Sequence, residues 1–157
     1  MESIAGWYKV ICRASVVVLL LSLSAMAELG GTESSIRADQ QRLNATRTVT
    51  QARAYAVHEI HTPNNSVIRE FVAPGGKVFA VTYRGQLVGE SNALLGSYSA
   101  QIGQAMKTVH NGKHRGGPVN IQLPGIVYQA TGHMRAYTVH AYLSHSLPQG
   151  VAVEDLR

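Results

Sequence analysis

The stretch Val67–Gly85 (VIREFVAPGGKVFAVTYRG) constrains the fold more than any other part of the chain. It holds two runs rich in β-branched and aromatic residues, separated by the turn sequence Pro74–Gly76. Proline fixes φ at the first central position of a turn, and glycine accepts the positive φ that a type II turn needs next. In the second run, Lys77–Arg84, both alternating faces are mostly apolar, as in a strand buried on two sides. The stretch therefore predicts a β-hairpin whose second strand is central in an antiparallel sheet.

Strand-like segments also flank this hairpin. Before it, Arg53–Thr62 ends at a Pro-Asn-Asn turn signal, so three successive strands with short links predict an antiparallel meander. Further runs follow at Val119–Leu123, Ile126–Thr131 and Arg135–His145, and Gly132–Met134 is expected to turn the last two into a hairpin.

Two segments have helical character. Ser91–Lys107 carries an apolar stripe at helical spacing, formed by Leu95, Tyr98, Ile102, Met106 and Val109. Glu28–Thr46 has a helix start near Thr32–Ser35 and only a thin apolar line, which predicts a peripheral helix. The expected fold class is α+β: an antiparallel sheet of five to six strands, one main helix packed on a face, and a peripheral N-terminal helix, in the order α-βββ-α-βββ.

Residues 1–27 are typical of a cleavable signal peptide, which leaves 28–157 as a single α+β domain. Lys9 and Arg13 supply a positive start, Ala14–Leu23 is apolar, and Ala25–Ala27 provides small residues for cleavage. The apolar run is far shorter than the roughly 20 residues that a spanning helix needs. We therefore expect an exported protein, periplasmic or secreted, with no membrane span after cleavage.

Charge and cysteine content exclude several classes of function. The formal net charge is +5, but the basic residues are scattered and only Lys113–Arg115 forms a cluster, so no nucleic-acid partner is expected. The single cysteine, Cys12, lies within the predicted leader. The exported chain is therefore expected to have no disulfide and no thiolate chemistry.

The seven histidines are the main candidates for metal binding. His58 and His61 are three apart on a predicted strand, so they should point to opposite faces. The segment His58–His61 also lacks one residue of the HExxH zinc signature. His133, His140 and His145 have odd spacings too, and His110 and His114 lie in a Gly-rich loop. We therefore expect these histidines to lie at the surface, and a metal site assembled from distant histidines is the alternative.

No catalytic motif is complete. Glu59 and Glu70 lie on adjacent predicted strands and could face each other as a hydrolase pair. The nearby Arg69 and Arg84 favour ordinary cross-strand ion pairs instead. A Ser-His-Asp triad would have to use one of the two aspartates, Asp39 and Asp155, which lie near the ends of the chain. The sequence therefore names no catalytic or cofactor-binding residue, and no cofactor is expected.

Several short motifs, spread over nearly the whole chain after residue 27, match the pattern of a known family: Leu29–Gly31, Ser35, Asp39, Tyr55, Val57, Val67–Val72, Pro74, Gly76, Val78–Val81, Leu94–Gly96, Tyr98, Gly132–Tyr137, Pro148, Gly150, Leu156 and Arg157. On these residues the chain resembles the DUF2844 family of exported proteobacterial proteins. Tyr83 and Gln86 depart from the family pattern, where tryptophan and proline are expected. The resemblance implies an exported single-domain protein and brings no known activity.

Two functional hypotheses remain. The first is a non-enzymatic accessory or binding protein of the bacterial envelope, whose partner is an envelope protein or a small ligand. The second is a small metal-binding protein or hydrolase that uses histidines brought together by the fold.

Overall fold

The structure is a computed structural model that describes residues 28–86, 88–109, 117–133 and 135–156. It contains one antiparallel sheet of seven strands in the order β1-β2-β3-β4-β7-β6-β5. The fold class is α+β, as predicted, but the expected five to six strands were too few. The strands are β1 (Thr46–Gln51), β2 (Ala56–His61), β3 (Val67–Val72), β4 (Val78–Gly85), β5 (Val119–Leu123), β6 (Ile126–His133) and β7 (Ala136–Leu143).

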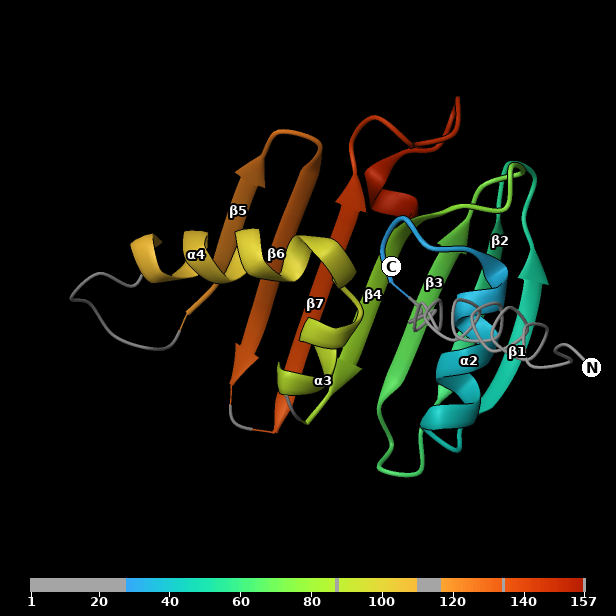
Figure 1. Cartoon of the computed structure of the whole chain (residues 1–157), viewed down its shortest axis with the longest axis horizontal. Coiled ribbons are helices and arrows are strands. Elements are labelled where there is room, and N and C mark those ends of the chain that lie inside the picture. Colours follow the sequence, from blue (N-terminus) through green and yellow to red (C-terminus); the bar gives the residue numbers. More distant parts are fainter. Residues whose placement is uncertain (1–27, 87, 110–116, 134, 157) are drawn as a thin grey trace, which may run out of the picture.

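The α-helices all lie on one face of the sheet, with α2 over β1–β3 and α4 across β5–β7 (Figure 1). The helices are α2 (Glu33–Arg42), α3 (Val88–Ala93) and α4 (Ser99–Val109), with short 3₁₀ turns η1 (Gly96–Tyr98) and η2 (Val153–Asp155). Among the described residues, no helix is long and apolar enough to span a membrane. We call the opposite side of the sheet the helix-free face, because no described α-helix lies on it.

The predicted hairpin is confirmed as β3 and β4, and β4 is the fourth of the seven strands. Six successive residues of β4, from Val78 to Tyr83, are buried. The register shifts at Phe71/Val72, where the partners pass from Ala80 to Val78 and leave Phe79 unpaired. This β-bulge lets Phe79 and Ala80 both pack with Phe71 in the core of the helix-free face.

Strand β1 was not predicted. Its sequence TRTVTQ contains one aliphatic residue, Val49, which is 52% exposed. An edge strand with both faces partly open has no apolar alternation to reveal it, so β-branched composition was its only signal.

The single helix predicted for Ser91–Lys107 is also wrong, because the segment breaks into α3, η1 and α4. Gly96 adopts φ +53°, and a Cβ at this position would collide with the carboxylate of Glu28. Leu95 and Ile102 of the predicted stripe are each 1% exposed, whereas Val109 is 56% exposed and lies outside the core. The N-terminal segment therefore passes so close to Gly96 that only glycine fits between α3 and α4 at this position.

The N-terminal helix covers the sheet more closely than a peripheral helix would. Ile36 of α2 is fully buried against the main core, which lies between the helices and the sheet. Thr32 precedes the helix, and its N–H donates a hydrogen bond to Ser35 Oγ (3.0 Å), as expected for a capped start. This docking places the buried Asp39 of α2 toward the sheet.

Candidate functional site

The histidines at the start of the sheet do not act together. His58 is buried on the face covered by α2, and Arg47 Nη1 lies 3.2 Å from its Nδ1. Burial and, to a lesser extent, the Arg47 charge lower the pKa of His58, so the neutral ring is favoured. His61 is exposed on the other side, where its Nε2 lies 2.7 Å from Glu59 Oε1. As the odd spacing predicts, the two rings cannot share a metal ion.

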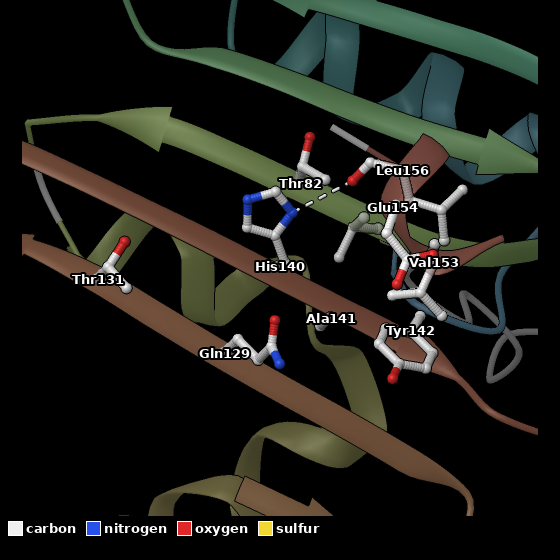
Figure 2. A pocket seen from close by; sticks show the side chains of 11 residues that line it. Thr82, Gln129, Thr131, His140, Ala141, Tyr142, Val153, Glu154 and Leu156 are labelled. Atoms are coloured by element: carbon white, nitrogen blue, oxygen red, sulfur yellow. Dashed lines mark hydrogen bonds between the residues drawn. The ribbon is translucent and has the colours of Figure 1, made fainter. Parts of the chain in front are cut away.

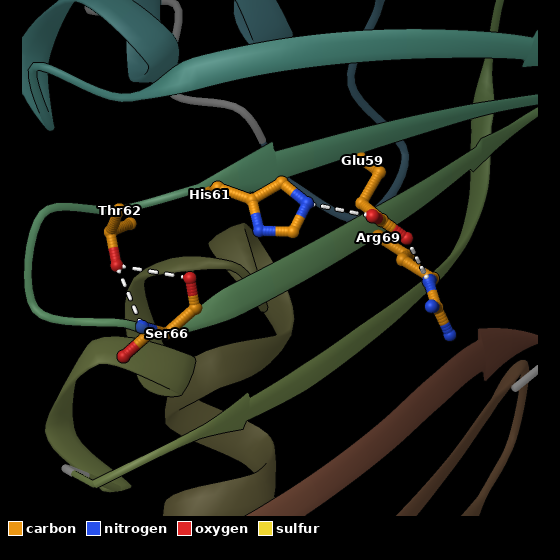
Figure 3. Close-up of polar contacts among 5 residues, drawn as sticks. All are labelled: Glu59, His61, Thr62, Ser66 and Arg69. Atoms are coloured by element: carbon orange, nitrogen blue, oxygen red, sulfur yellow. Dashed lines mark hydrogen bonds and ion pairs between the residues drawn. The ribbon is translucent and has the colours of Figure 1, made fainter.

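The hypothesis of a carboxylate pair formed by Glu59 and Glu70 is wrong. In the β2–β3 register, Glu59 lies opposite Arg69, and Glu70 lies opposite His58 on the other face. Glu59 forms an ion pair with Arg69 Nε at 2.5 Å (Figure 3). Hydrogen bonds from Arg69 and His61 lower the pKa of Glu59. The expected cross-strand ion pair is therefore present, and Glu59 contacts both Arg69 and His61 on the exposed side of the sheet.

The remaining histidines are dispersed. His110 and His114 lie outside the described residues, and His133 is at the far end of β6. Within the part of the chain that the structure describes, no three His, Cys, Asp or Glu side chains are placed to hold a metal ion.

The helix-free face carries a cleft of about 370 Å³ where the C-terminal segment folds back over the sheet (Figure 2). Register places Thr82, His140 and Gln129 in one row across β4, β7 and β6. The lining residues are Ala80, Val81, Thr82, Gln129, Thr131, His140, Ala141, Tyr142, Val153, Glu154 and Leu156.

A backbone hydrogen bond orients His140 in this cleft. Its Nδ1 lies 3.2 Å from the carbonyl oxygen of Leu156. Because a carbonyl oxygen can only accept, Nδ1 must carry the proton, and in the neutral ring Nε2 is left as an acceptor. Figure 2 shows the imidazole beside Thr82, with this second nitrogen directed away from the C-terminal segment. The cleft therefore contains an imidazole ring whose orientation is fixed by the backbone.

The C-terminal segment is anchored by a small apolar core next to the cleft. Leu156 is 3% exposed and packs with Phe71, Phe79 and Ala80, while Tyr55 contributes its ring to the aromatic cluster. The β-bulge turns Phe79 to this face, and Phe79 thus forms part of the apolar surface on which Leu156 packs. Anchoring of Leu156 also fixes the carbonyl group that holds His140.

The other polar side chains of the cleft were not singled out by the sequence. Thr82, Gln129 and Thr131 occupy alternate positions that point to the helix-free face. Alternating polar residues on β6 were the available signal, because an outward row next to an outward histidine can form a binding surface. Their convergence depends on pairing between strands that are distant in sequence.

The fold and cleft together define an α+β protein with a single sheet, covered by helices on one face and bearing a polar cleft on the other. The chain belongs to the DUF2844 family of proteins of unknown function, whose family profile matches residues 25–156. The match confirms the resemblance carried by the sequence motifs. No curated protein and no solved structure matches the chain.

Proposed function

We propose that this protein is exported and binds a small, uncharged ligand that bears hydroxyl and amide groups, without catalysing a reaction. The observation that carries the proposal is the cleft around His140, in which the hydrogen-bonding side chains of Thr82, Gln129 and Thr131 converge and Glu154 is the one charged residue of the described lining. Small-molecule sites are typically concave, with a few placed polar groups that fix the orientation of the ligand.

The lining chemistry favours a neutral ligand over an anion. Gln129 can both donate and accept, Thr82 and Thr131 offer hydroxyl groups, and His140 Nε2 can accept. Among the described lining residues there is no lysine or arginine, and the one charged side chain is that of Glu154, which would repel a carboxylate or phosphate. The ring of Tyr142 adds an apolar surface, which suits the C–H face of a sugar. An acetamido sugar carries hydroxyl groups, an amide group and a C–H face, so it matches this lining.

Calorimetric titration with triacetylchitotriose, a trimer of an acetamido sugar, tests this proposal. We expect saturable binding, weakened at least tenfold by Gln129→Ala and by His140→Ala, because each removes a hydrogen bond to the ligand. Gln122→Ala is the matched control, since Gln122 lies on the same face but on β5, outside the cleft. Equal affinity of all four proteins, or no binding of the trimer, would contradict the proposed ligand class.

Export is supported by the signal-like sequence of residues 1–27 and by the docking of the residues that follow. Leu29 is 2% exposed, and its N–H donates to Leu94 O at 2.9 Å. Gly30 N–H donates to Val78 O at 2.8 Å. Cleavage after Ala27 would therefore leave a new N-terminus held close to the folded body.

Expression of the full chain in a Gram-negative host tests the export proposal. We expect the periplasmic fraction to contain protein whose intact mass begins at Glu28, and Ala27→Leu to accumulate as the uncleaved precursor, because processing requires a small residue before the cut. Ala38→Leu is a control for an alanine outside the leader. A wild-type chain that keeps residues 1–27 and stays in the cytoplasm would refute export.

A further inference from the structure

A second polar group of residues lies on the other face of the sheet, beneath α2. Glu70, at the centre of the fold on β3, is 0% exposed, and neither of its carboxyl oxygens has a hydrogen-bond partner. Asp39 of α2 is 1% exposed, and its Oδ2 is also without a partner. Asp39 Oδ1 accepts a hydrogen bond from Arg42 Nε at 3.0 Å. Two buried carboxyl groups are thus brought together by a helix and a strand.

The charged groups around Glu70 come from three elements. On α2 they are Asp39 and its partner Arg42, and on β2 the residue opposite Glu70 is His58. On β1, Arg47 acts on Glu70 through its charge. The opposing residue on β4, Val81, is apolar. Arg47 attracts a carboxylate, but its Nη1 contacts His58, and the Glu70 oxygens receive no hydrogen bond. Glu33 of α2 also acts on His58 and favours its charged form.

These surroundings favour the protonated form of Glu70. Burial is the largest cause and the neighbouring Asp39 the second, and despite Arg47 they raise the pKa of Glu70 to about 8. An ionised carboxylate that is buried without hydrogen bonds is strongly unfavourable, so ionisation must be accompanied by hydration or by movement of a neighbouring element.

We propose that α2 is a proton-dependent latch, docked on the sheet while Glu70 carries a proton and released when Glu70 ionises. Strand β3 is paired along its length on both sides, with β2 and β4, and cannot readily move. Helix α2 is tied to the sheet by backbone bonds only at its start, where Thr32 forms a bridge to Lys77, and the described strand pairings do not include residues 33–42. The helix also carries the Asp39 charge that would repel an ionised Glu70. Release of α2 would admit water to Glu70 and separate the two carboxylates.

Trypsin cleavage after Arg37, an exposed residue of α2, reports this release. Between pH 7 and pH 9.5, we expect cleavage of the wild type to accelerate at least tenfold relative to Glu70→Gln, which cannot ionise. Asp39→Asn should reduce the acceleration, because it removes the repulsion. Glu33→Gln, an exposed acid of the same helix, is the control and should behave as the wild type.

A carbon-13 NMR titration of the Glu70 carboxyl group completes the test. The latch requires a midpoint between pH 7 and 9 and α2 cleavage that rises over the same range. A midpoint below pH 6 would overturn the proposal. Equal pH dependence of cleavage in the wild type and in Glu70→Gln would also overturn it, even if Glu70 titrates late.

Discussion

Replacing Glu70 with glutamine should raise the free energy of unfolding at pH 8 by about 3 to 5 kcal/mol. The pKa of Glu70 rises from an ordinary value of 4.5 to about 8 in the folded state. Between these values the unfolded chain releases a proton that the folded chain retains. The stability associated with Glu70 is therefore fully present below pH 4.5, falls as pH rises toward 8, and is constant above that. Glutamine keeps the size of the side chain and removes this dependence.

Urea unfolding at intervals from pH 5 to pH 9 measures the effect. The two proteins should have similar stability at pH 5, and their difference should grow up to pH 8. Burial lowers the pKa of His58 on folding, but His58 is present in both proteins, so its contribution is common to the two curves. Glu59→Gln is a control, because Glu59 is only partly buried and its pKa is lowered. Parallel stability curves for the wild type and Glu70→Gln would contradict the assignment of a buried, neutral Glu70.

Replacing Leu156 with alanine should lower the free energy of unfolding by about 2 to 4 kcal/mol, as large-to-small substitutions in cores do. Leu156 is 3% exposed and packs against Phe71, Phe79 and Ala80. Its loss should also free the carbonyl group that orients His140, so ligand affinity should fall even though no side chain that contacts the ligand has changed.

Chemical denaturation and triacetylchitotriose titration of the same sample separate these two effects. Val49→Ala provides the comparison, since Val49 is 52% exposed and its truncation should change stability by less than about 0.5 kcal/mol. If Leu156→Ala were as stable as Val49→Ala and bound the trimer like the wild type, the C-terminal segment would not be the wall of the cleft.

The central part of the fold could be predicted because its signals are local. The turn at Pro74–Gly76 and the two apolar faces of the strand that follows it are properties of one short stretch, and they located β3 and β4 correctly. The opposite orientations of His58 and His61 likewise follow from strand geometry alone. By contrast, the break at Gly96 depends on contact with Glu28, a residue far away in sequence.

The buried pair of Glu70 and Asp39 and the cleft around His140 could not be predicted, because each is formed by residues that are distant in sequence. In the sequence, Asp39 lies in a segment whose thin apolar line predicted a peripheral helix. In the structure it lies on the buried side, opposite Glu70, because Ile36 holds that face against the sheet. The cleft joins β4, β6, β7 and residues 153–156, and only the fold-back of the C-terminal segment brings them together. Strand periodicity predicts which face a residue occupies, but not which distant residue lies beside it.

An amide chemical-shift map of the protein with triacetylchitotriose shows directly whether the ligand binds on the helix-free face. We expect the perturbed amides to cluster on β4, β6 and β7, around Thr82, Gln129 and His140, and on residues 153–156. Perturbations confined to α2 and α4, or none at saturating trimer, would contradict it.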